Sequence, residues 1–221
     1  MTDARAPRAR RIGLLGGSFD PPHLAHLALG RVAREALQLD ELRWLPAGAP
    51  WQKADRGMAA PEHRLAMLGL LLQGEPGCVI DRRELDRTGP TYTLDTVRAL
   101  QAEAEAEAGA GQGAAPALPA EWFLILGQDQ YARFDTWHGW RELLGRVQLA
   151  VAAREGLTTV QPPPALAAVP HRCTVLPLPR HDISASDIRA RRARGELIDL
   201  LVGPAVARYI DQHHLYEAAR G

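Results

Sequence analysis

Short apolar runs alternate along the chain with longer segments that have the apolar spacing of helices. Runs of three to five residues bounded by turn residues are typical of buried strands, and a period of three to four residues is typical of helices. The predicted strands are Ile12–Leu15, Leu42–Leu45, Cys78–Asp81, Trp122–Leu126, Gln148–Ala152 and Thr174–Leu176. The predicted helices are His23–Leu37, Pro61–Leu72, Thr93–Ala106, Trp140–Leu144, Ser184–Arg194 and Pro204–His213.

This alternation predicts repeated strand–helix units and a mostly parallel sheet. The expected fold class is α/β, a Rossmann-like open sheet with helices on both faces and a small C-terminal helical tail. We expect a disordered segment at residues 1–10 and a single domain over residues 11–221, because no internal repeat is visible. The low-complexity tract at 102–119 predicts a helix end that runs into a flexible loop, and Gln161–Pro170 predicts a proline-rich loop.

The composition is that of an ordinary globular domain without a global charge. The chain has 221 residues, of which 46% are hydrophobic, so it can bury a sizeable core. Basic and acidic residues both total 26, so no net field attracts the chain to nucleic acid or to a membrane surface. Any bound phosphate must be held locally. Lys53, the single lysine, lies between Gln52 and Ala54, which excludes a Walker A motif.

Cysteine usage and hydropathy predict a cytoplasmic protein. Cys78 and Cys173 are isolated, with no spacing typical of a disulfide framework or a zinc site. The run Ile12–Leu15 is too short for a signal-peptide core, and no stretch approaches the ~20 apolar residues of a membrane span.

The segment after the first predicted strand has the features of a phosphate-binding turn. In an open parallel sheet, phosphate is usually bound at this first turn between a strand and a helix. Gly16 and Gly17 let the backbone bend close to a phosphate. Asp20 before proline predicts a helix start capped by this aspartate. The free amides and the positive end of the helix dipole would then face an anion. His23 and His26, three residues apart, would share one face of the first turn.

The dinucleotide-binding fingerprint Gly-x-Gly-x-x-Gly is absent from this turn. Gly109, Gly111 and Gly113 fall in the low-complexity tract instead. The sequence therefore lacks the main feature that would support a hydride-transferring, dinucleotide-binding enzyme.

The string GGSFDPPHLAH at residues 16–26 resembles the signature of the nucleotidyltransferase superfamily and, within it, of the nicotinate-nucleotide adenylyltransferases. Further segments resemble this family in the same order: LPAGAPWQK at 45–53, ELDRTGPTYTLDT at 84–96, ILGQDQYARFDTWHGW at 125–140, ISASDIR at 183–189 and VARYIDQHHLY at 206–216. The resemblance covers nearly the whole chain. It implies adenylyl transfer from MgATP to nicotinate mononucleotide, giving nicotinate adenine dinucleotide and pyrophosphate.

A second anion-binding helix start is predicted near the C-terminal end. Ser184 with Asp187 three residues later matches a capping box. The resemblance aligns this segment with the family's Ile-Ser-x-Thr-x-x-Arg motif, which grips the ATP phosphates, with Ser186 in place of threonine. Arg189 is the expected contact to the β- or γ-phosphate, because a guanidinium fork matches phosphate oxygens.

The resemblance also implies the remaining contacts, although Trp51 and Gln52 replace residues usual in the family beside Lys53. A pyridine ring can stack on the indole of Trp137. The expected ATP-binding residues are Gly16, Gly17, Ser18, Phe19, His23, His26, Lys53, Gly127, Asp129, Ile183, Ser184, Ser186 and Arg189. The expected nicotinate mononucleotide-binding residues are Ser18, Lys53, Thr91, Tyr92, Thr93 and Trp137.

The implied chemistry needs positioning more than proton transfer, because the attacking phosphate is already ionised near neutral pH. His23, His26 and Arg189 are the expected catalytic residues. We expect no resident metal, with Mg²⁺ entering on the ATP phosphates, because no dedicated carboxylate cluster is evident.

Two other functions share parts of this pattern. Another nucleotidyltransferase, such as a phosphopantetheine adenylyltransferase, has a similar first loop but typically Thr-x-Gly-His at the histidine pair. A non-catalytic nucleotide sensor would keep the fold and bind ATP without turnover. We expect ATP and nicotinate mononucleotide as partners, no nucleic acid or membrane, and a monomer or homodimer.

Overall fold

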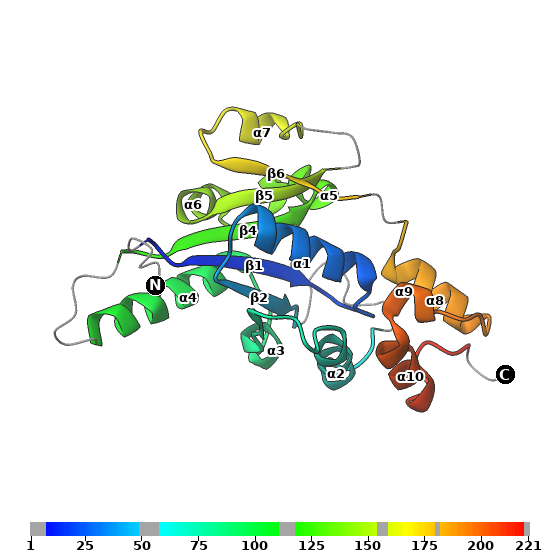
Figure 1. The fold of residues 1–221 in the computed structure, drawn as a ribbon. Coiled ribbons are helices and arrows are strands. Elements are labelled where there is room, and N and C mark those ends of the chain that lie inside the picture. The colour runs from blue at the N-terminus through cyan, green and yellow to red at the C-terminus, as the bar shows by residue number, and fades with distance from the viewer. Residues whose placement is uncertain (1–7, 49–57, 111–117, 154–158, 180–181, 219–221) are drawn as a thin grey trace, which may run out of the picture.

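The computed structural model describes residues 8–48, 58–110, 118–153, 159–179 and 182–218. Within these ranges six strands form one parallel sheet in the order β3-β2-β1-β4-β5-β6 (Figure 1). The strands are β1 (Arg11–Gly17), β2 (Glu41–Pro46), β3 (Cys78–Ile80), β4 (Glu121–Gly127), β5 (Gln148–Ala153) and β6 (Cys173–Pro177). The expected α/β fold is confirmed, and every strand pair in the described sheet is parallel.

Helices connect the strands and follow the last one. They are α1 (Leu24–Ala36), α2 (Pro61–Leu71), α3 (Arg83–Asp86), α4 (Thr93–Ala110), α5 (Gln128–Tyr131), α6 (Trp140–Arg146), α7 (Pro164–Ala167), α8 (Ala185–Ala193), α9 (Asp199–Val202) and α10 (Pro204–Gln212), with a 3₁₀ turn η1 at Phe134–Thr136. None of the described helices is long and apolar enough to cross a membrane. Helices α8, α9 and α10 form the expected C-terminal tail and lie where the strands end (Figure 1).

The sheet buries both of its faces. The strands alternate: Leu15 and Ile125 join one core with residues of α1, α2 and α8–α10, whereas Leu14 and Leu124 join a second core with residues of α4–α7. Such two-sided burial explains why these strands are almost continuously apolar in sequence. Helices on both faces of the sheet are therefore confirmed.

The strand order reverses beside β1. From β1 the chain proceeds outward to β2 and β3, and it then returns to the other side of β1 to form β4, β5 and β6. The crevice beyond the carboxyl ends of β1 and β4 is thus the topological switch point, where open α/β sheets bind ligands.

Many element ends differ slightly from the expected ones, and the short helices α3, α5 and α9 were not predicted. Three further differences fall in segments that were expected to be irregular. Helix α4 continues through Ala110, because the Ala- and Glu-rich first part of the low-complexity tract is made of strong helix formers. The proline-rich loop contains α7, which Pro164 begins at a position that tolerates proline. In the segment expected to be disordered, residues 8–10 lead into β1, and Arg8 Nη1 lies 2.9 Å from a carboxylate oxygen of Asp40.

Candidate active site

The two glycines after the apolar run are the last residues of β1 rather than part of the turn. Neither has a positive φ, so backbone freedom does not explain them. Gly16 is exposed, and a Cβ there would meet only the Leu45 carbonyl oxygen at 4.0 Å. A Cβ on Gly17 would lie 3.1 Å from the Phe19 ring. Gly16 therefore keeps the carboxyl end of β1 open, and Gly17 makes room for an aromatic ring.

Phe19 supports the site from beneath. Its backbone is left-handed, with φ of 47°, and its side chain is 1% exposed in the core. The ring packs edge-on against His26, with centroids 5.1 Å apart. In this position Phe19 could meet a nucleotide only through its backbone.

The histidine pair begins helix α1. His23 is the N-cap residue, and its backbone N–H donates to His26 Nδ1 at 3.2 Å. The two rings stack with centroids 3.7 Å apart. The prediction that they share a face is confirmed, but the expectation that Asp20 caps this helix is wrong, because the helix begins at Leu24.

Asp20 instead joins three distant segments. Its side chain is buried, and Oδ1 accepts from the Ala59 backbone amide at 3.1 Å and from the Tyr216 hydroxyl at 2.7 Å. Arg189 Nη1 donates to the Asp20 backbone carbonyl at 2.6 Å and lies 3.6 Å from Oδ2. Asp20 therefore ties the first loop to the start of α2, to α8 and to the segment after α10.

The second predicted helix start is confirmed at α8. Ser184 is the N-cap, and its hydroxyl accepts from the Asp187 amide at 3.1 Å. Arg189 lies one turn later, and its Nη2 is 3.5 Å from the Ser186 hydroxyl. Ile183 packs against the first core. The structure thus brings Arg189 to the first loop, although 169 residues separate it from Asp20.

Arg64 in α2 is a residue that sequence reasoning missed. It is 1% exposed and donates to the backbone carbonyls of Ser18 at 2.8 Å, Ala47 at 2.8 Å and Ala59 at 3.2 Å. Burial lowers the pKa of its guanidinium, and nearby Asp20 opposes this shift. The available signal was that Arg64 precedes Met67, Leu68 and Leu71 at helical spacing on the buried face of α2. A buried cation at such a position must have partners.

The residues expected at the nicotinate end lie on the same edge of the sheet. Thr91 lies beside Gly48, where a Cβ would be 3.5 Å from the threonine methyl group. Ala47, the preceding residue, donates its backbone N–H to the carbonyl of Gly17 at 2.9 Å. This chain of contacts links Thr91 and Tyr92, just before α4, to the end of β1.

Two aromatic contacts extend this group toward η1 and α6. The Tyr92 ring lies 4.4 Å from that of His138, and half-buried Trp137 stacks on Phe134 at 5.2 Å. Thr93 is the first residue of α4 and is half-buried. The structure therefore brings Tyr92 and the residue next to Trp137 together, as a common binding region requires.

Gly127 and Asp129 stand at the other side of the switch point. Gly127 ends β4 and is the N-cap of α5, and Asp129 is exposed in the first turn of that helix. Lys53, Trp51 and Gln52 lie outside the described residues. Across the described ranges, no group of three or more His, Cys, Asp or Glu side chains could hold a metal ion.

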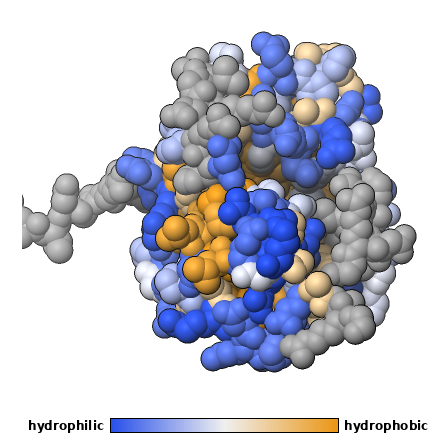
Figure 2. Space-filling view, turned by 90° about the vertical axis from the view of Figure 1, so that its right-hand side faces the viewer, coloured by the Kyte–Doolittle hydropathy of each residue, from blue (hydrophilic) through white to orange (hydrophobic). Residues whose placement is uncertain are grey.

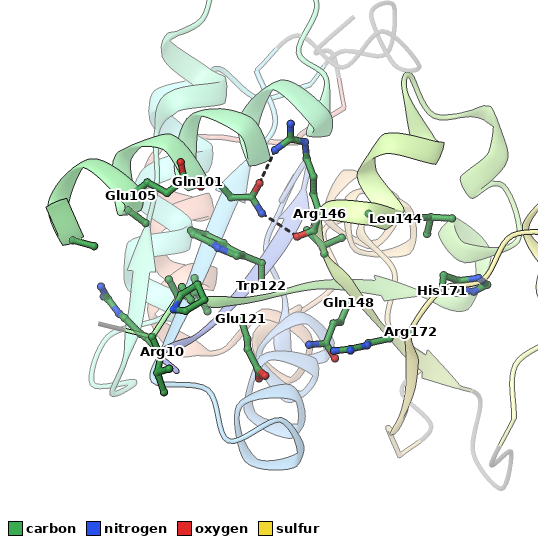
Figure 3. A pocket seen from close by; sticks show the side chains of 18 of the residues that line it. Arg10, Gln101, Glu105, Glu121, Trp122, Leu144, Arg146, Gln148, His171 and Arg172 are labelled. Atoms are coloured by element: carbon green, nitrogen blue, oxygen red, sulfur yellow. Dashed lines mark hydrogen bonds between the residues drawn. The ribbon is translucent and has the colours of Figure 1, made fainter. Parts of the chain in front are cut away.

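A cavity of about 1270 Å³ opens at the opposite edge of the sheet, near the amino ends of β1, β4 and β5 (Figure 3). None of the predicted site residues lines it. Its Arg146 is already bonded to Gln101 and to Glu142. We therefore place the functional site at the carboxyl edge, where the sequence motifs meet, and not in this cavity.

Figure 2 faces the edge that carries the C-terminal helices. Its surface is largely hydrophilic around an apolar area. Leu197 lies between α8 and α9 and is 88% exposed, and Leu200 lies in α9 and is 89% exposed.

Comparisons with known proteins identify the family to which the chain belongs. The family described as "Cytidylyltransferase-like" matches residues 14–191. A probable nicotinate-nucleotide adenylyltransferase of Methylibium petroleiphilum is 49% identical over 216 residues, covering 96% of this chain and 95% of the relative. A probable nicotinate-nucleotide adenylyltransferase of Bordetella petrii is 47% identical, and the match covers 94% of this chain and 99% of the relative.

A solved structure has the same fold. The Plasmodium falciparum nicotinic acid mononucleotide adenylyltransferase complexed with NaAD superposes with a TM-score of 0.71 at 18% sequence identity. The match covers 94% of this chain and 97% of that one. The chain belongs to the cytidylyltransferase-like family and, within it, to the nicotinate-nucleotide adenylyltransferases.

Proposed function

We propose that the protein transfers the adenylyl group of ATP to nicotinate mononucleotide, giving nicotinate adenine dinucleotide and pyrophosphate in NAD biosynthesis. The observation that carries the proposal is the meeting of two predicted phosphate-binding elements at the switch point. The stacked His23 and His26 begin α1, and Arg189 of α8 reaches the loop just before them. The full-length similarity to named relatives supports the same activity.

In the proposed reaction a phosphate oxygen of the mononucleotide bonds to the α-phosphorus of ATP, and the bond from this phosphorus to the pyrophosphate oxygen breaks. Negative charge grows on the α-phosphoryl group and on the leaving pyrophosphate. His23 and His26 at the positive end of α1 can stabilise the first, and Arg189 the second. Their fixed geometry also aligns the reacting groups.

We propose that Mg²⁺ enters as MgATP. A small hard cation of this kind prefers phosphate oxygens and water, which the substrate brings with it. When bound, the ion would neutralise negative charge on the phosphates, as the guanidinium of Arg189 would.

The nicotinate end of the acceptor is proposed to bind beside Tyr92 and Trp137. The half-buried rings of Tyr92 and Trp137 could stack on a pyridine ring. The hydroxyl groups and amides of Thr91 and Thr93 could donate to the ring carboxylate. Nicotinate, with its charged carboxylate, would then be preferred to nicotinamide.

A panel of acceptors tests this function. Purified protein with MgATP is incubated with nicotinate mononucleotide, nicotinamide mononucleotide or phosphopantetheine, and pyrophosphate release is measured. We expect the first acceptor to support the fastest release. Faster release with phosphopantetheine would replace the proposed acceptor, and ATP binding without release for any acceptor would indicate a sensor.

A further inference from the structure

We propose that Tyr216 is a positioning residue for adenylyl transfer: through Asp20 it fixes Arg189 and the loop before the histidine pair. This inference rests on the proposed function. It gives a role to the segment VARYIDQHHLY, which the reaction itself leaves without one.

The contact between Tyr216 and Asp20 is specific. The phenol oxygen lies 2.7 Å from Asp20 Oδ1, and Asp20 is only 4% exposed. Burial and the neighbouring carboxylate raise the pKa of the Tyr216 phenol, so it keeps its proton and donates throughout the usual pH range. Tyr216 therefore acts as a fixed hydrogen-bond donor at this site.

The backbone on both sides of the contact is unusual. Tyr216 itself has a left-handed φ of 60°, and Phe19, next to Asp20, has a φ of 47°. Residues other than glycine adopt this region mainly where the surrounding structure imposes it, and such residues cluster at functional sites. Both ends of the hydrogen bond are thus held in place by their surroundings.

Asp20 passes this constraint to Arg189. Two donors, Tyr216 and the Ala59 amide, occupy Oδ1 and set the rotation of the carboxylate. Oδ2 then faces Arg189 Nη1 at 3.6 Å, while the backbone carbonyl of Asp20 accepts from the same nitrogen at 2.6 Å. Removal of the Tyr216 hydroxyl leaves Oδ1 with one donor and frees the carboxylate to turn. The guanidinium would lose its alignment toward the nucleotide phosphates.

The chain contains a matched control in Tyr209. This tyrosine lies in α10, is also half-buried, and its hydroxyl lies 3.0 Å from His63 Nδ1 in α2. Tyr209→Phe removes the same atom from the same C-terminal region, but the hydrogen bond that it removes goes to His63, which is not assigned to the reaction. A purely structural role of the tail would make the two variants alike.

The test compares wild type, Tyr216→Phe and Tyr209→Phe, each with Arg189 or with Arg189→Lys. We measure kcat and KM with nicotinate mononucleotide, thermal unfolding, and ATP affinity by calorimetry. The free energy of one hydrogen bond to a charged group corresponds to roughly a tenfold change in a rate constant or a binding constant. We expect Tyr216→Phe to lower kcat about tenfold and to weaken ATP binding by several-fold. Tyr209→Phe should stay within about twofold of wild type in both, and each variant should unfold at a somewhat lower temperature than wild type because each loses one hydrogen bond.

The Arg189→Lys background shows whether the effect passes through Arg189. There, adding Tyr216→Phe should lower kcat by less than about twofold, because the pair is coupled. A tenfold loss in both backgrounds, or an effect equal to that of Tyr209→Phe, would overturn the inference. ATP affinity is measured without acceptor, so it decides the inference even if nicotinate mononucleotide supports no turnover, a result that would count against the proposed function alone.

Discussion

The His23 and His26 rings stack at 3.7 Å, and the backbone N–H of His23 donates to His26 Nδ1 at 3.2 Å. The His26 imidazole therefore accepts a hydrogen bond from the N-cap residue and helps to cap helix α1. A substitution of His26 affects both the reaction and the helix cap. We expect a large effect on kcat and a small effect on the free energy of unfolding.

We expect His26→Ala to lower kcat ~10²–10³-fold, the usual loss when one positioned donor is removed from a developing charge. The lost cap should reduce the free energy of unfolding by only about 1 kcal/mol. Steady-state pyrophosphate release and urea unfolding measure the two quantities. His171→Ala, at the opposite edge of the sheet, is the control and should keep wild-type turnover. Near-normal turnover of His26→Ala would remove this imidazole from the mechanism.

Arg64→Lys should lower the free energy of unfolding by about 2–4 kcal/mol. A lysine ammonium cannot reach the carbonyls of Ser18, Ala47 and Ala59 together, so buried acceptors lose their donors. Arg98→Lys on the exposed face of α4 changes the same groups and should stay within about 0.5 kcal/mol. Equal stability of the two variants in urea would contradict the role assigned to Arg64.

Two glycine substitutions should have opposite effects on stability. A Cβ on Gly30 in α1 would lie 2.6 Å from the Trp44 ring, which is fully buried, so Gly30→Ala should cost about 1–3 kcal/mol. A Cβ on Gly69 in α2 would meet nothing within 4 Å. Gly69→Ala should therefore stabilise the protein by about 1 kcal/mol through helix propensity. Urea midpoints that move in the same direction would contradict this packing.

Glu84 makes stability depend on pH. Burial raises the pKa of its carboxyl group, although its Oε1 accepts from the Thr96 hydroxyl at 2.9 Å. The folded state therefore binds more protons than the unfolded state above the ordinary glutamate pKa, and this group's contribution to stability is lost as the pH rises through its raised pKa.

Glu84→Gln keeps an acceptor for Thr96 but cannot ionise. We expect its free energy of unfolding, relative to wild type, to increase from about pH 4 toward pH 8. Urea unfolding across this range measures the difference between the two proteins. A difference that does not change with pH would show that burial of Glu84 has no net effect on its ionisation.

The repeated units were predictable because each strand carries its own apolar run and each helix its own period. The histidine spacing and the Ser184 cap were also predictable, since both depend on residues within one turn of helix. Asp20 was misread as a helix cap because its true partners, Ala59, Arg189 and Tyr216, are 39, 169 and 196 residues away. Arg64 was missed because its acceptors are backbone carbonyls, which any residue supplies.

The bond between Asp20 and Tyr216 also has a consequence for synthesis in the cell. A ribosome makes the first loop early, but the partner hydroxyl emerges only after almost two hundred further residues. Helices and neighbouring strands can form meanwhile, whereas contacts of such long sequence separation form late. A nascent chain halted before Tyr216 would thus contain the histidine pair without the alignment that we infer for Arg189, and it should be a poor catalyst until Tyr216 has been made and contacts Asp20.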